Sequence, residues 1–143
     1  MNFRSLLSIV LLTLFVIGIT VTASPQTNKE LLFNVNVPFD FVAGGAHLLA
    51  GRYSVYHFPT KRVILIESVS GKGAAFMQVS IATAGPGENP NTLVFNQYDN
   101  RYFLSQVTTK NDHEIHICSK SREEQVIIAQ RQQSEKKAVA VGY

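Results

Sequence analysis

The stretch from Leu93 to Val107 constrains the fold most, because two runs rich in Val, Phe, Tyr and Leu flank the pair Asp99-Asn100. Such side chains fit the pleated surface of a sheet, and Asp and Asn tolerate the positive φ that a tight turn requires. The stretch therefore predicts a β-hairpin in which at least Asn100 adopts positive φ. Two registers stay open, a two-residue loop of Asp99 and Asn100 or a three-residue loop that adds Arg101 and a bulge. A slip between them exchanges the two faces of the hairpin.

The length of the chain, 143 residues, and its 45% of hydrophobic and 16% of charged residues predict one folded domain. A chain this apolar is not disordered, and it is too short for two ordinary domains. Cys118 is the only cysteine, so an internal disulfide is excluded. Burial of a core must therefore supply the stability of the domain.

The N-terminal residues predict a secretory signal peptide over residues 1–23. Arg4 precedes an apolar run from Leu6 to Ile19, and short side chains follow up to Ala23, after which we expect cleavage. The alternative is an uncleaved membrane anchor, but the run is shorter than the ~20 residues that a spanning helix needs. No cysteine stands at the cleavage site to take a lipid. We therefore expect a periplasmic or extracellular protein without a membrane span after cleavage, beginning with a flexible leader at residues 24–30.

The charge of the chain gives no sign of a nucleic-acid partner. Of its 13 lysines and arginines, Arg4 lies in the predicted signal peptide, and the others stand against 10 acidic residues, a balance of about +2. These charges are scattered rather than clustered into a basic stripe, which is what nucleic-acid binding usually requires.

Short alternating segments separated by turn residues predict an antiparallel sheet. Residues 31–37 alternate apolar and polar side chains until Pro38, which cannot donate a ladder hydrogen bond. The further strands expected outside the hairpin are 39–42, 53–58, 63–69, 74–83 and 113–118. About seven strands with such spacing are typical of a small β-sandwich or barrel, so the chain is expected to be mainly β, with a single domain over residues 31–133.

One helix is predicted near the C-terminus, at residues 122–133. Ser121 and Glu124 have capping-box spacing, in which the serine oxygen accepts from the backbone amide of Glu124 while the Glu124 side chain reaches back to the cap. Val126 and Ile127, with Ala129 or Gln130, should border its contact side. Residues 134–143 are expected to form a frayed tail.

Four spaced segments carry a resemblance to a known family: Val37-Pro38-Phe39-Asp40-Phe41, Leu49-Ala50-Gly51-Arg52-Tyr53, the hairpin from Leu93-Val94-Phe95 through Tyr102-Phe103-Leu104, and Ser121 with Glu124. With these the chain resembles a family of small exported bacterial proteins, of acidobacterial type. That family has a Val-Pro-Phe-x-Phe start, a Leu-Pro-Ala-Gly-x-Tyr segment, a Leu-Val-Phe hairpin and a Ser-x-x-Glu close. The chain departs from this pattern at Leu49, where proline is favoured, and at Thr108, where tryptophan is common. Since the family has no assigned activity, the resemblance implies an exported, β-rich protein and no catalytic residue.

The histidines and the cysteine are the first candidates for chemistry, since imidazole and thiolate are ligands of zinc and copper. On a strand, His116 and Cys118 would share a face while His113 would lie on the other, and His57 could join them only through tertiary contact. Ordinary histidines and a small buried cysteine are the better interpretation. We expect no metal and no cofactor. Cys118 could act as a nucleophile only with a base that the sequence does not place.

The carboxylates and the sequence motifs do not indicate an enzyme. Asp40, Glu67, Asp99 and Glu114 could in principle supply an acid/base pair, but their expected positions at turns and solvent faces favour a role in solubility. The chain contains no Gly-x-Ser-x-Gly, no His-Glu-x-x-His and no phosphate-binding glycine loop. No catalytic residue is predicted.

The aromatic side chains are the remaining signal, because a small sheet needs fewer rings on one face. Core packing explains most of them, but some could form a ligand groove or a partner surface. The expected function is that of a non-enzymatic exported domain that binds a partner protein or an apolar ligand, or serves as a structural module of the cell envelope. The alternative is a small periplasmic metal-binding or hydrolytic enzyme. The residues of the possible binding surface are Tyr53, Tyr56, Tyr98, Tyr102 and Phe103.

Overall fold

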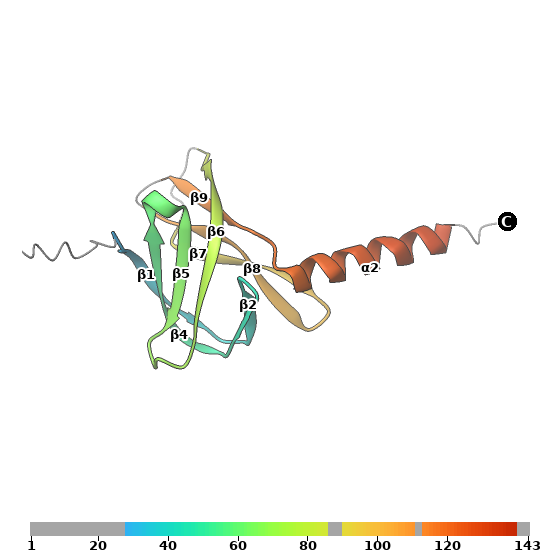
Figure 1. Cartoon of the computed structure of the whole chain (residues 1–143), viewed down its shortest axis with the longest axis horizontal. Coiled ribbons are helices and arrows are strands. Elements are labelled where there is room, and N and C mark those ends of the chain that lie inside the picture. Colours follow the sequence, from blue (N-terminus) through green and yellow to red (C-terminus); the bar gives the residue numbers. More distant parts are fainter. Residues whose placement is uncertain (1–27, 86–89, 111–112, 140–143) are drawn as a thin grey trace, which may run out of the picture.

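The computed structural model describes residues 28–85, 90–110 and 113–139, which form a bent β-sheet with a helix near the C-terminus (Figure 1). The predicted signal peptide, residues 1–23, lies outside the described residues, as does the first part of the predicted leader. The elements in chain order are β1 (Glu30–Val37), β2 (Phe41–Ala43), β3 (Ala46–Leu48), β4 (Gly51–Phe58), the 3-10 helix η1 (Pro59–Lys61), β5 (Val63–Ser68), β6 (Ala74–Thr83), β7 (Thr92–Tyr98), β8 (Arg101–Thr108), β9 (Glu114–Cys118) and α2 (Arg122–Val139).

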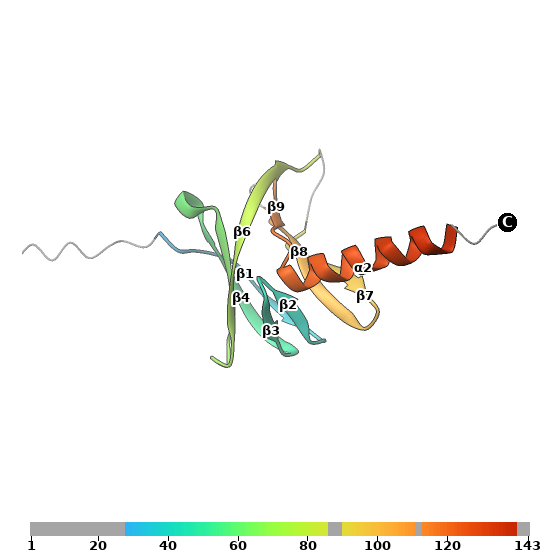
Figure 2. The same cartoon turned by 45° about the vertical axis from the view of Figure 1, so that its right-hand side comes forward.

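The sheet bends along β6, a strand that belongs to both of its halves. The strand order is β1-β4-β5-β6-β9-β8-β2-β3, with β7 paired to β8. Residues 74–78 of β6 pair with β5, and residues 79–83 pair with β9. Figure 2 shows the half that contains β4 and the half that contains β8 at an angle to one another, on either side of the core.

The fold confirms the prediction of a mainly β domain with a C-terminal helix and corrects three of its details. The described residues form nine strands rather than the predicted seven or so, and β3 was missed because its three residues are too few to show a period of two. The sheet is mixed, since β2 pairs with β8 in parallel. It does not close into a barrel, because the end strands β1 and β3 are not paired with each other in the described part of the chain.

The core lies between the two halves and follows the alternation of the strands. In β6, Ala75, Met77 and Val79 are buried, whereas the residues between them face outward. β5 is buried more completely, with Ile64 and Ile66 on the inner face and Leu65 on the outer face. Burial of these apolar side chains is the main source of stability in a domain without a disulfide.

The β7–β8 hairpin closes with the two-residue loop that the sequence left as one of two options, since Tyr98 pairs directly with Arg101. The prediction that Asn100 adopts positive φ is wrong, because Asp99 does so, at 55°. A positive φ followed by a negative one is the sign pattern of a type II′ turn. Such a turn requires the unusual backbone at its first central residue, so the strain falls on Asp99.

The β2–β3 hairpin also closes with two residues, Gly44 and Gly45, because Ala43 pairs with Ala46. Both glycines have positive φ, 56° and 88°. A Cβ added to Gly44 would lie 2.3 Å from the backbone oxygen of Phe76, a distance that real Cβ atoms do not show. Gly44 is therefore required both by its backbone conformation and by the close approach of β6.

α2 begins at Arg122, as predicted, and runs to Val139 rather than to residue 133. It leaves the sheet and extends beyond the β7–β8 hairpin (Figures 1 and 2). Val126, expected on the contact side, is 49% exposed, and Ile127 is half-buried. Among the helices of the described residues, none combines the length and the apolar character needed to cross a membrane.

Candidate functional site

The five residues of the predicted aromatic surface lie in different parts of the molecule. Tyr53 and Phe103 belong to the interior, with exposed fractions of 2% and 1%. Tyr56 lies on the outer face of the first half of the sheet, where the Lys29 Nζ atom sits 3.7 Å from its ring centre. A single exposed patch of these five side chains is therefore not present.

Tyr98 and Tyr102 lie on the second half of the sheet, and each is covered by a neighbour. Tyr102 stacks on Phe39, with 4.2 Å between the ring centres. Tyr98 packs edge-on against Phe103, and the Arg131 guanidinium of α2 lies 5.2 Å from its ring centre. These contacts serve packing between elements.

Two of the candidate metal ligands meet in the interior. The rings of His57 on β4 and His116 on β9 are 4.6 Å apart, which is the tertiary contact that the sequence could not place. His113 precedes β9 at a positive φ of 49° instead of lying on the strand. Within residues 28–85, 90–110 and 113–139, no three His, Cys, Asp or Glu side chains come together as a metal site.

Cys118 is a buried thiol without nucleophilic character. Burial, assisted by the nearby Glu124 carboxylate, raises the pKa of the Cys118 thiol to about 12. The thiol therefore stays protonated at neutral pH, whereas the thiolate is the form that attacks substrates and binds metals.

The four carboxylates considered for acid/base chemistry lie apart, and each has its own contact. Asp40 accepts a hydrogen bond from the Ala50 amide at 2.7 Å, and Glu67 pairs with Lys29 at 3.3 Å. The two others are Asp99, 2.8 Å from Arg131, and Glu114, 3.9 Å from His116. They fix loops and strands rather than form a catalytic pair.

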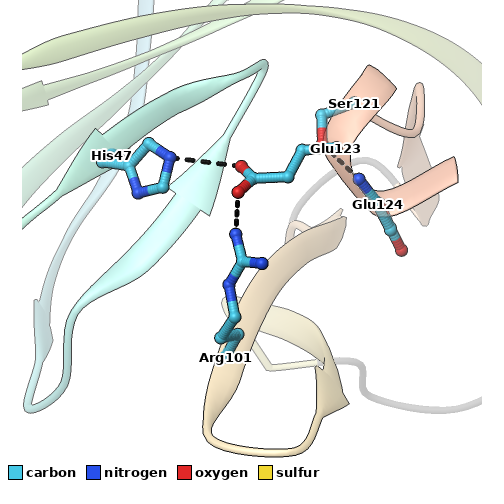
Figure 3. A network of polar contacts seen from close by, with 5 residues as sticks. All are labelled: His47, Arg101, Ser121, Glu123 and Glu124. Carbon is cyan, nitrogen blue, oxygen red and sulfur yellow. Dashed lines mark hydrogen bonds and ion pairs between the residues drawn. The ribbon is translucent and has the colours of Figure 1, made fainter. Parts of the chain in front are cut away.

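The start of α2 holds a polar network that joins three elements (Figure 3). Glu123 lies between two cations or potential cations, His47 of β3 at 3.1 Å and Arg101 of β8, which donates to its other carboxylate oxygen. The backbone amide of Glu124 donates to the Ser121 hydroxyl at 3.2 Å, which is one half of the predicted capping box. The network ties the helix to both hairpins.

The other half of the capping box is replaced by a contact with the sheet. The Glu124 side chain is 2% exposed, and its Oε1 accepts hydrogen bonds from Asn96 at 2.9 Å and from the Tyr98 hydroxyl at 3.2 Å. Burial and this carboxylate raise the pKa of Tyr98. Glu124 therefore serves to dock the helix, and sequence spacing alone could not distinguish this role from capping.

A pocket of about 410 Å³ opens beside β4 and the β5–β6 turn. Two cations, Arg52 and Lys72, line it together with the hydroxyls of Ser68 and Ser70, which lie 2.8 Å apart. None of its lining residues is acidic. We call it the Lys72 pocket, and its remaining lining residues are Leu49, Ala50, Gly51, Tyr53 and Val69.

Hydrogen bonds fix both walls of the Lys72 pocket. On one wall the Tyr53 hydroxyl donates to the Leu49 carbonyl at 2.5 Å, next to the bond between Ala50 and Asp40. On the other wall the Val69 amide donates to the Arg52 carbonyl at 3.0 Å, which holds the β5–β6 turn against β4. The pocket is therefore part of the fold and not a gap between loose loops.

A second pocket of about 470 Å³ shares Arg52 and Val69 with the first. We call it the Asn36 pocket, and its other lining residues are Asn34, Val35, Asn36 and Ser54. Together the two pockets form what we call the Arg52 groove. Sequence reasoning did not identify it, because its residues come from β1, β4, β5, the β3–β4 loop and the β5–β6 turn, and no local pattern unites them.

Comparisons of the chain with protein-family models, with curated proteins and with solved structures find no match. The resemblance to a family of exported bacterial proteins stays a prediction from the spaced motifs. A function for the protein has to be inferred from its own residues.

Proposed function

We propose that this protein is a non-enzymatic, exported domain that binds an anionic ligand in the Arg52 groove. One observation carries the proposal: Arg52 and Lys72 line the same pocket, and neither forms an ion pair with another described residue. A ligand carboxylate or phosphate would supply the missing counter-charge through charge-assisted hydrogen bonds, which are about twice as strong as neutral ones.

The rigidity of the pocket supports this function. Both walls are held by hydrogen bonds that involve Tyr53, Asp40 and the backbone of Arg52. A ligand that enters such a pocket orders few additional groups, so less of the interaction free energy is lost on binding.

The proposal keeps the binding function expected from the sequence and changes the chemistry of the ligand from apolar to anionic. The aromatic side chains on which the apolar expectation rested are divided between the core and separate packing contacts. The enzyme alternative has less support, because the candidate carboxylates lie apart and the Cys118 thiol is protonated at neutral pH. A structural module of the cell envelope would require no ligand in the groove.

Titration calorimetry with galacturonate, and with glucose as the neutral control, tests the proposal. Galacturonate should bind and glucose should not, and Arg52→Ala or Lys72→Ala should weaken binding about tenfold or more, since a hydrogen bond to a charged group contributes ~1.5–3 kcal/mol. Lys61→Ala is the matched control, because Lys61 is an exposed cation on η1, outside the groove. Equal binding by all variants would contradict the proposal.

Export is proposed from the order of basic, apolar and short residues over positions 1–23. Mass spectrometry of the protein recovered from the periplasm or the medium should give Ser24 as its first residue. A chain that retains Met1 and stays in the membrane fraction would contradict this part of the proposal.

A further inference from the structure

We propose that the ligand of the Arg52 groove is a linear acidic polysaccharide whose sugar units occupy the Lys72 pocket and the Asn36 pocket in succession. This inference rests on the proposed function and extends it from a single anionic group to a chain. Its starting point is that both pockets share Arg52 and Val69, so that one ligand can occupy them without leaving the surface.

The two pockets differ in chemistry, but each offers polar partners to one sugar unit of such a chain. Two cations and two hydroxyls surround the first, which suits a carboxylate-bearing sugar. The second is lined by two amides and a hydroxyl, from Asn34, Asn36 and Ser54. An amide offers both donors and acceptors, which match the hydroxyl groups of a sugar.

Cross-strand pairing keeps these polar side chains on one face. Asn34 of β1 stands opposite Ser54 of β4, and Asn36 stands opposite Arg52. The Ser54 hydroxyl donates to the Asn34 Oδ1 atom at 2.7 Å, which orients the amide and leaves its NH₂ group directed away from that bond. Arg52 therefore has an amide on one side, in the Asn36 pocket, and Lys72 on the other.

The position of β4 favours a polysaccharide over an acidic peptide. Extended peptides commonly bind by adding a strand to a free sheet edge, where backbone groups are unpaired. β4, which carries Arg52, pairs with β1 on one side and with β5 on the other, so its backbone is already used, and a peptide added at the free edge of β1 would be separated from Arg52 by that strand. Recognition across β4 must then come from side chains, and those present match hydroxyl and carboxylate groups.

Two acidic side chains lie beside the groove: Asp40, which accepts a hydrogen bond from the Ala50 amide at 2.7 Å, and Glu67, whose charge is balanced. Glu67 of β5 stands opposite Ser54, and it pairs with Lys29 at 3.3 Å. The exposed aliphatic side chains Leu49 and Val69, at 65% and 56%, flank the cations and offer apolar contact to the C–H faces of sugar rings.

The experiment compares ligands of increasing length by calorimetry on the full mature chain. The probes are galacturonate, its linear dimer and tetramer, neutral maltotetraose and a tetraglutamate peptide. The tetramer should bind at least tenfold more tightly than galacturonate, and maltotetraose and tetraglutamate should bind at least tenfold more weakly than the tetramer. Asn36→Ala should weaken tetramer binding several-fold and galacturonate binding by a smaller factor, whereas Arg52→Ala should weaken both about tenfold or more.

The matched control is Gln78→Ala, which removes an exposed amide from β6, outside the groove. Circular dichroism of each variant verifies that it is folded. Galacturonate binding without a gain for the tetramer, or equal binding of tetraglutamate, would overturn the polysaccharide and leave the anionic site standing. No binding of any acidic probe would overturn both proposals.

Discussion

Two hairpins of this protein close with loops of the same length but lie in different surroundings. Gly44, between β2 and β3, lies against the backbone of β6, whereas no atom lies where a Cβ of Gly45 would be, and Asp99 and Asn100, between β7 and β8, are exposed. In both turns a residue adopts positive φ. The comparison teaches that the neighbouring strand, and not the length of the loop, decides which residues a turn tolerates.

Glu123 connects the two hairpins. Its carboxylate contacts His47 of β3 and Arg101 of β8, and both contacts are at least one-third exposed (Figure 3). Exposed ion pairs contribute ~1 kcal/mol or less. The hairpins are therefore held in place mainly by their own burial, which the following substitutions measure separately.

The largest effect is expected from Gly44→Ala. The added Cβ would clash with the Phe76 backbone oxygen, and alanine is strained at a φ of 56°. Strain and overpacking each cost ~1–3 kcal/mol, so urea denaturation should show a loss of about 3 kcal/mol or more. Gly45→Ala is the control, because its φ is 88° but its Cβ meets no atom within 4 Å, and it should lose only ~1 kcal/mol. Equal losses would mean that the packing of the first turn is unimportant.

Leu104→Ala tests whether the exposed turn nevertheless belongs to a buried hairpin. Leu104 is 4% exposed and pairs with Phe95 across the strands. Removing a buried leucine side chain leaves a cavity and should cost ~2–5 kcal/mol in the free energy of unfolding. Phe95→Ala should also destabilise, since this ring packs against the core from a partly buried position. Val94→Ala, at a residue 38% exposed, should cost less than ~1 kcal/mol, and a larger loss there than at Leu104 would contradict the described register.

Glu124→Ala tests how far the second hairpin depends on α2. The substitution removes the acceptor of two hydrogen bonds, from Asn96 and Tyr98, and should cost ~1–3 kcal/mol. Glu124→Gln keeps an acceptor oxygen and should lose less. If neither variant loses stability, the helix does not support the hairpin.

The same substitution should change the titration of Tyr98. Burial raises the pKa of Tyr98 above 10.0, and the charge and hydrogen bond of Glu124 raise it further, while Arg131 lowers it. Without the carboxylate the pKa of Tyr98 should fall, so its phenolate should form at lower pH in Glu124→Ala than in the parent protein. Ultraviolet titration measures this, with Tyr98→Phe to assign the signal. An unchanged or higher pKa would contradict the contact.

The smallest effect is expected at the tip of the second hairpin. Asp99→Gly relieves the positive φ and removes only an exposed pair with Arg131, so the stability should change by less than about 1 kcal/mol. Asp99→Val should cost ~1–2 kcal/mol, the scale of a strained backbone position, and Asn100→Val should cost less. A larger loss of stability for Asn100→Val than for Asp99→Val would support the turn expected from the sequence, in which Asn100 adopts positive φ.

Local sequence was sufficient for the strands that are long enough to alternate. The bounds of β6, Ala74–Thr83, and the start of α2 after Ser121 agree with the prediction, because alternation and capping are properties of neighbouring residues. The strand pair around Asp99 was also evident. The sequence did not show which of the two central residues, Asp99 or Asn100, adopts positive φ, since either side chain tolerates it.

The features of the fold that could not be predicted depend on contacts between residues that are distant in the sequence. β2 joins β8 in parallel and β6 passes between two halves of the sheet, and neither pairing leaves a local pattern. The sequence analysis placed Tyr53 and Tyr56 on one possible binding surface, whereas Tyr53 is buried between the two halves of the sheet and Tyr56 lies on the outer face.

The sequence by itself therefore determined the class of the fold, the absence of an internal disulfide and the positions of most strands, because backbone geometry and side-chain alternation act over a few residues. Only the tertiary structure decided that Glu124 turns into the sheet, that His57 meets His116, and that Arg52 and Lys72 share a pocket. Each of these depends on side chains brought together by chain folding, and burial and charge act through space irrespective of their separation along the chain.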